Sequence, residues 1–232
     1  MEGIDLINSW KIQLDNSIKA TWVEFCHNKK IILTESDLKC HLYSELLKRQ
    51  LTPPYGVHSE VTHYHIQEQQ TKEIRKYRFR DIAILNPSKI QLSEELWQKE
   101  EDSLNKGFKH QGEAILIELK FDRQNDLKIA PIDIANLKNY RPHTRYPKIF
   151  YIIWGSNNKN FKALKNLMAK ELNELIKPHE RTNLLNHIYG VVFDTEELAE
   201  FKFVQSDKKV WGVKECSTLN RKSLMKKYIS NE

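Results

Sequence analysis

The sequence lacks any hydrophobic run long enough to cross a bilayer as a helix. One of its longest apolar runs, Ile149–Trp154, falls far below the roughly 20 residues that a membrane span needs. Glu2 and Asp5 stand where a secretory signal would be basic. We therefore expect a soluble protein that is not exported.

Cysteine, glycine and proline are also scarce. The three cysteines include no CxxC pair, so the sequence offers neither a disulfide framework nor a zinc knuckle, and a reducing cytoplasm is the expected location. Seven glycines and seven prolines are too few for collagen-like, linker-like or low-complexity chains. The motifs GxGxxG, GxxxxGK and GxSxG are absent, which argues against glycine-rich phosphate loops and against serine hydrolase chemistry.

What the sequence does contain is enough apolar residues for a core and an excess of positive charge. Hydrophobic residues make up 40% of the 232 positions, which suits one domain with a substantial extension. Thirty-seven Lys and Arg residues face 31 Asp and Glu residues, so the formal net charge is +6. This balance favours a polyanionic partner, although charge alone does not establish one.

Hydrophobic spacing predicts an α/β domain over residues 1–232. Helices are expected at 4–25, 34–47, 93–105, 131–140 and 161–176, and strands at 57–67, 75–85, 113–121, 148–154 and 188–193. The strand at 113–121 is mostly apolar on both faces, which is typical of a central strand covered by helices. We expect an N-terminal helix within 1–33, a core over 34–155 and a C-terminal addition over 156–232.

Charged residues interrupt two of the expected strands. Glu118 and Lys120 share a face of the strand at 113–121, because side chains alternate along a strand. Asp81 replaces an apolar residue on the core-facing side of the strand at 75–85. The acid-x-Lys pattern occurs five times, but only at Glu118 does a separate acid-bearing strand precede it. Asp81, Glu118 and Lys120 are therefore expected to meet at one edge of the sheet.

Residues 34–154 resemble the PD-(D/E)xK nuclease superfamily, which has the restriction-endonuclease-like fold. The shared order is a helix, a strand, a strand bearing Asp, a strand bearing Glu-x-Lys, a helix and a strand. Two features depart from the family pattern: Arg80 stands where the family name has proline, and a helix at 94–105 separates the two motif strands. The resemblance implies a central mixed sheet flanked by helices and a nuclease that acts on DNA.

The resemblance also implies roles for the residues. Asp81 and Glu118 would hold Mg²⁺, for which Mn²⁺ can substitute, together with the backbone carbonyl of Leu119. Lys120 would position the attacking water and offset charge on the phosphate. Glu45, on the inward stripe of the helix at 34–47, would orient the water on the metal or bind a second ion.

Two other acids compete with Glu45 for the third carboxylate. Glu35 lies in the first turn of the same helix, where the helix dipole already explains an acid, so Glu45 is preferred. Glu60, in the strand at 57–67, is a weaker candidate because that strand can simply expose it.

Basic residues near this site are candidates for contacts with the DNA backbone. Lys76, Arg78 and Arg80 lie on the outward side of the Asp81 strand, and Arg141 and Arg145 follow the expected helix at 131–140. A solvated strand face explains the same charges equally well.

Several alternatives stay open at this point. The three site residues could form a structural ion network, so the alternative function is a noncatalytic nuclease-fold subunit that binds DNA or joins a complex. His58, His63 and His65 have a spacing that could bind zinc, but a solvated strand face is the simpler explanation. An endonuclease of restriction, repair or mobile-element type is preferred on family grounds, with RNA as an alternative substrate and a homodimer or partner subunit as an open question.

Overall fold

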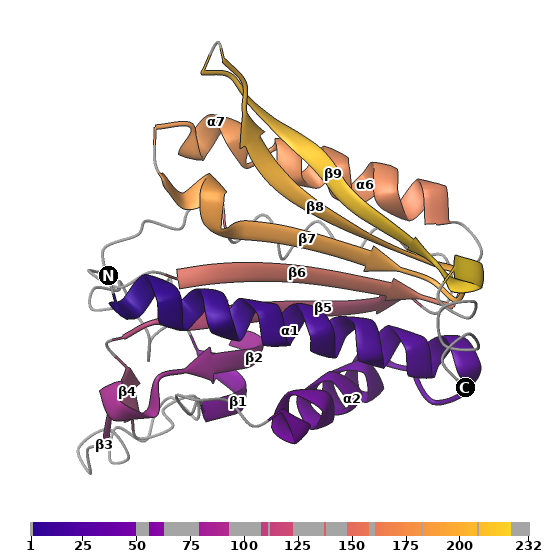
Figure 1. Ribbon diagram of the computed structural model, residues 1–232, viewed down its shortest axis with the longest axis horizontal. Coiled ribbons are helices and arrows are strands. Elements are labelled where there is room, and N and C mark those ends of the chain that lie inside the picture. Colours follow the sequence, from indigo (N-terminus) through magenta and orange to yellow (C-terminus); the bar gives the residue numbers. More distant parts are fainter. Residues whose placement is uncertain are drawn as a thin grey trace, which may run out of the picture.

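A seven-stranded mixed sheet forms the centre of the molecule (Figure 1). The computed structural model describes residues 2–49, 56–62, 79–92, 108–110, 112–122, 137, 148–157, 161–181, 183–207 and 209–223. In spatial order the strands are β1 (Gly56–Thr62), β2 (Phe79–Leu85), β5 (Ala114–Asp122), β6 (Lys148–Ser156), β7 (Ile188–Phe193), β8 (Glu197–Gln205) and β9 (Trp211–Asn220). A separate two-stranded sheet pairs β3 (Ile90–Leu92) with β4 (Phe108–His110).

The type of strand pairing changes twice across the large sheet. Antiparallel pairs join β1 to β2 and β2 to β5, whereas β5, β6 and β7 are parallel to one another. Antiparallel pairing resumes from β7 to β8 and from β8 to β9. The expectation of an α/β protein with a mixed sheet is confirmed.

Two N-terminal helices cover one face of the sheet. These are α1 (Glu2–His27) and α2 (Glu35–Lys48), and their apolar stripes pack on strand residues such as Ile117 and Ile153. The expected capping box opens α2, because the Asp37 amide donates to Oγ1 of Thr34 while the Asp37 carboxylate accepts from the Thr34 amide. No helix among the described residues is long and apolar enough to span a membrane.

The opposite face of the sheet is covered by α6 (Phe161–Asn173), followed by the short helices α7 (Ile176–His179) and η3 (Asn183–His187). Leu116 and Trp154 face this second core, whereas their neighbours Ile117 and Ile153 face the first. Strands β5 and β6 are therefore buried on both faces, as expected for central strands. This two-sided burial explains their nearly continuous hydrophobic sequences.

Hydrophobic spacing predicted neither β8 nor β9 as a whole, although the alternation in Glu200–Phe203 is compatible with a strand. They extend the same sheet that begins at β1, so the C-terminal part continues the core layer. Along β8, Phe201 and Phe203 are buried, while Glu200 is half-buried and Lys202 exposed. Most of β9 is exposed or half-buried, so its hydrophobic signal is weak.

Several expected elements fall outside the described residues. The helix expected at 93–105 lies there entirely, as does the tip of the hairpin between β1 and β2. Of the helix expected at 131–140, only Leu137 is described; it is helical and 1% exposed.

The expected cytoplasmic location stays a prediction.

Trp22 provides a test of how α1 is anchored. Its indole is fully buried and donates a hydrogen bond of 2.8 Å to the carbonyl of Asp194. Trp22→Ala should lower the free energy of unfolding by about 3–5 kcal/mol, because a large aromatic contact and a buried hydrogen bond are both lost. Ile12→Ala, at a position on the same helix that is 58% exposed, should change it by less than about 0.5 kcal/mol. Urea denaturation measures both values, and equal losses would contradict the docking of α1 through this side.

Candidate active site

The neighbouring strands β2 and β5 bring Asp81 beside the Glu118–Lys120 segment. Ile82 pairs with Ile117 in the antiparallel register, so continuing the register one step sets Asp81 opposite Glu118. Oδ2 of Asp81 accepts a hydrogen bond of 2.7 Å from the backbone amide of Leu119. The Asp81 carboxylate is thereby held against the backbone between Glu118 and Lys120.

These side chains stand where the buried part of the two strands ends. Asp81 lies on the same face of β2 as Ala83, and Glu118 lies on the same face of β5 as Leu116. Ala83 and Leu116 are both fully buried. Asp81, Glu118 and Lys120 themselves are only half-buried. Charged groups can remain ionised there, because water still reaches them.

Lys120 is paired with an acid from α2. Its ammonium lies 3.2 Å from Oε2 and 3.3 Å from Oε1 of Glu35, the first residue of that helix. The structure therefore brings Glu35, rather than the preferred Glu45, to the Glu-x-Lys segment. Sequence reasoning had named Glu35 but attributed it to the helix dipole.

Glu45 points inward as expected and is 8% exposed, yet its contacts lie elsewhere. Its carboxylate is 2.5 Å from the ammonium of Lys48 and 3.9 Å from the guanidinium of Arg49. Ten residues separate it from Glu35, which is about 15 Å along a helix axis. The burial of Glu45 is thus compensated by cations at the end of its own helix.

The other candidates cannot be placed in the site. Lys76, Arg78, Arg141 and Arg145 lie outside the described residues, as do His63 and His65 and the side chains of Glu60 and Arg80. The proposed contacts of these residues with DNA stay predictions.

The oxygen donors of this site are few. Among the described residues, no three or more His, Cys, Asp or Glu side chains gather in a way that could hold a metal ion. Mg²⁺ commonly takes only one or two carboxylates from a protein and completes its shell with water and substrate phosphate. The carboxylates of Asp81 and Glu118, on adjoining strands, supply the hard oxygen donors that such a two-carboxylate site requires.

Comparisons with protein-family models, with curated proteins and with solved structures find no match to this chain. A function is therefore inferred from the strand order and from the contacts of the site residues alone.

A second group of buried titratable side chains lies at the opposite end of β5. His110 is 1% exposed and stands near Glu113 and Lys148, which are also buried. Burial, reinforced by the positive charge of Lys148, lowers the pKa of His110 to about 4. Glu113 accepts a hydrogen bond of 3.1 Å from the Asn86 amide group. Sequence reasoning missed this group, because His110 becomes buried only through contacts between distant segments.

The lowered pKa of His110 makes stability depend on pH. The unfolded chain, with an ordinary histidine pKa near 6.5, binds a proton that the folded chain rejects until about pH 4. The contribution of neutral His110 is complete above pH 6.5 and is lost as the pH falls towards 4. Between pH 7.5 and pH 5 we expect a loss of about 2 kcal/mol.

Urea denaturation of the wild type and of His110→Leu across this range measures the effect. The wild type should lose this stability relative to the variant, which has no imidazole to protonate. A difference between the two proteins that stays constant with pH would show that His110 titrates normally.

Proposed function

We propose that this protein is a Mg²⁺-dependent nuclease that hydrolyses phosphodiester bonds in DNA, most simply as an endonuclease. The observation that carries the proposal is the hydrogen bond from the Leu119 amide to Asp81, which sets one strand's carboxylate against the Glu118–Lys120 segment of the next. Two acids and a lysine lie together at the half-buried end of the sheet. Such a group is better explained by phosphoryl chemistry than by a structural role in the hydrophobic core.

The order of elements supports a restriction-endonuclease-like core. Helix α2 is followed by β1, by β2 with Asp81, by β5 with Glu118 and Lys120, and by β6, and the two-stranded sheet of β3 and β4 is inserted between β2 and β5. Strands β5 and β6 are parallel, and a parallel pair needs a crossover that is usually helical. Leu137, in that connection, is helical. Apart from this insertion, the order of the described elements supports the proposed resemblance to the PD-(D/E)xK superfamily.

Each side chain in the site has a distinct task under this proposal. Asp81 and Glu118 would hold Mg²⁺, which when bound makes a water more acidic and polarises the scissile phosphate. Lys120 places a positive charge where negative charge grows on the phosphate, and its ammonium can orient the attacking water. Glu35 is a positioning residue, because its carboxylate fixes the ammonium of Lys120.

The net charge of +6 is consistent with a nucleic-acid substrate. Electrostatic attraction of this kind depends on the phosphate backbone and does not distinguish DNA from RNA. Plasmid DNA, single-stranded DNA and RNA should therefore be offered to the purified protein in parallel, with Mg²⁺ or Mn²⁺ and with EDTA as the control.

Lys120→Ala separates metal binding from hydrolysis. The variant should lose cleavage by at least about 100-fold, because a charge aimed at the transition state is removed. It should keep the rise in melting temperature that Mg²⁺ produces in the wild type, since the carboxylates remain. Asp81→Asn and Glu118→Gln should lose both cleavage and the metal-induced rise. Full cleavage by Lys120→Ala would assign the catalytic role to another residue.

Glu35→Gln and Glu45→Gln form a matched pair on one helix. Glu35→Gln releases the ammonium of Lys120 and should slow cleavage roughly 10-fold or more, a typical effect of loosening a catalytic group. Glu45→Gln should leave the rate within about 2-fold, because its partners are Lys48 and Arg49. Single-turnover rates at saturating Mg²⁺ measure both. The reverse ranking would identify Glu45 as the acid that serves the site.

A further inference from the structure

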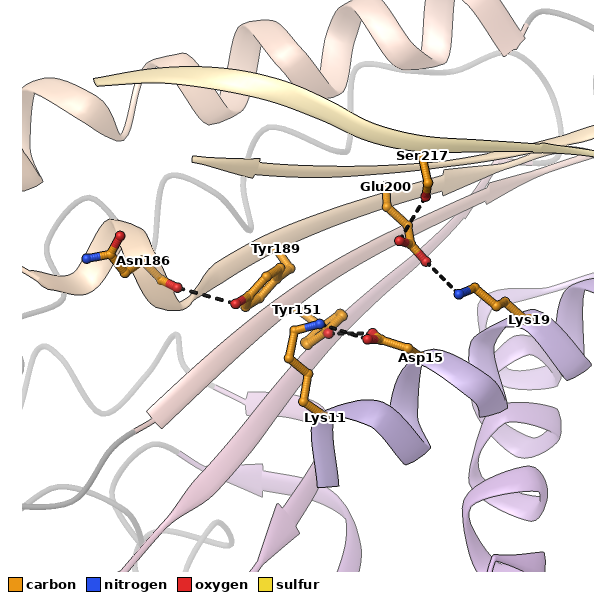
Figure 2. A network of polar contacts seen from close by, with 8 residues as sticks. All are labelled: Lys11, Asp15, Lys19, Tyr151, Asn186, Tyr189, Glu200 and Ser217. Carbon is orange, nitrogen blue, oxygen red and sulfur yellow. Dashed lines mark hydrogen bonds and ion pairs between the residues drawn. The ribbon is translucent and has the colours of Figure 1, made fainter. Parts of the chain in front are cut away.

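A cleft of about 280 Å³ lies between α1 and the C-terminal half of the sheet, and none of its lining residues belongs to the candidate active site. Lys11 and Asp15 of α1 form one wall, and Glu200 and Lys202 of β8 form the other. Tyr151 and Tyr189 of the parallel strands lie between them (Figure 2).

The two tyrosines form a rigid aromatic platform. Their rings stack with centroids 5.2 Å apart and an interplanar angle of 20°. Tyr151 is buried, and its hydroxyl donates a hydrogen bond of 2.6 Å to Asp15. Tyr189 is half-buried, and its hydroxyl donates to the carbonyl of Asn186 at 3.4 Å (Figure 2). A fixed, partly exposed ring of this kind loses little entropy when another ring stacks on it.

The ammonium group of Lys11 lies over the Tyr189 ring of this platform. This ammonium lies 4.4 Å from the centroid of the Tyr189 ring and 2.7 Å from Oδ2 of Asp15. An exposed cation–π contact contributes about 0.5–1 kcal/mol, whereas a base stacked on an aromatic ring contributes about 1–3 kcal/mol. An incoming base can therefore replace the ammonium on the ring, while Lys11 keeps its ion pair with Asp15.

Lys202 lines the cleft, and a second lysine, Lys214, lies directly beside it on the next strand. Lys202 of β8 and Lys214 of β9 are direct register partners, and both are exposed. Like charges placed opposite each other on neighbouring strands repel and weaken the pairing. Neither lysine forms an ion pair with any described residue, and the nearby Glu200 already binds Ser217 at 2.9 Å and Lys19 at 3.6 Å. A phosphate bound between the two ammonium groups would remove this repulsion.

We propose that this cleft binds one nucleotide, with its base stacked on Tyr189 and its phosphate between Lys202 and Lys214. A volume of about 280 Å³ is at the small end of ligand sites, which suits a single nucleotide rather than a larger cofactor. The same chemistry is offered by a free mononucleotide and by one residue of a single strand.

Binding to the full chain is measured in EDTA, so that hydrolysis does not interfere and the outcome does not depend on nuclease activity. The probes are AMP, followed by calorimetry, and a fluorescein-labelled single-stranded DNA dodecamer of mixed sequence, followed by anisotropy. Tyr189→Leu should weaken binding of whichever probe the wild type binds by roughly 10-fold or more, because the stacking surface is lost. Tyr189→Phe keeps the ring and should bind within about 2-fold of the wild type.

A charge-matched pair of double variants tests the phosphate position. Lys202→Gln/Lys214→Gln should weaken binding roughly 10-fold and make it less sensitive to salt. Lys162→Gln/Lys170→Gln removes the same charge from exposed positions on α6, across the sheet, and should bind as the wild type does.

Each outcome decides the proposal. Binding of AMP that depends on Tyr189 and on the two β-strand lysines identifies a site for a free nucleotide, and the same dependence for the dodecamer alone identifies a site for a strand. The absence of binding by both probes would overturn the proposal, and so would equal losses in the two lysine double variants. If Tyr189→Leu fails to fold, the comparison of the lysine variants still decides, since all four positions are on the surface.

Discussion

The burial of β5 and β6 on both faces is the constraint on which the rest of the structure depends. A parallel pair has to be covered on both sides, and here α1 and α2 cover one face while α6 covers the other (Figure 1). Along β5 burial is nearly complete up to Leu119 and then gives way to half-buried positions. Lys120 lies just past this limit and Glu118 just before it. The candidate active site therefore stands at the end of β5 where charges can be solvated.

The charged side chains at that end of β5 are balanced by groups that lie next to them. Asp81 accepts a backbone amide hydrogen bond, and Lys120 is matched by Glu35 from the first turn of α2. The negative charge of Glu35 also suits the positive end of its helix dipole, so one carboxylate serves both the helix and the lysine. Explaining Glu35 by the dipole alone was therefore incomplete. An acid in the first turn of a helix can also reach a neighbouring strand when that turn lies over the strand's end.

The sequence predicted the helices and strands whose apolar side chains recur with a single clear period. The apolar stripe of α1, the Thr34 capping box of α2 and the two-faced hydrophobic strands β5 and β6 were all predicted, because local spacing determines them. The stripe of α2 showed which face of the helix points inward, but not which turn lies beside Lys120. That choice depends on the packing of α2 against β5. Contacts between Lys11 and Tyr189, or between Trp22 and Asp194, join segments more than 170 residues apart and leave no local pattern.

The width of the sheet explains why the C-terminal strands differ from the rest. Seven strands at about 4.8 Å spacing span roughly 29 Å, whereas two helices about 10 Å wide cover roughly 20 Å of one face. On the other face α6 reaches β8 and β9, so Phe201 and Phe203 are buried there. On the face of α1, Leu198 of β8 is still buried, whereas Lys202 and Lys214 are exposed, so residues in that part of the two strands have to be compatible with water. Glu200, Lys202 and Lys214 meet that requirement. The mixture of charged and apolar residues that obscured β8 and β9 in the sequence is thus the same property that leaves a polar cleft beside α1.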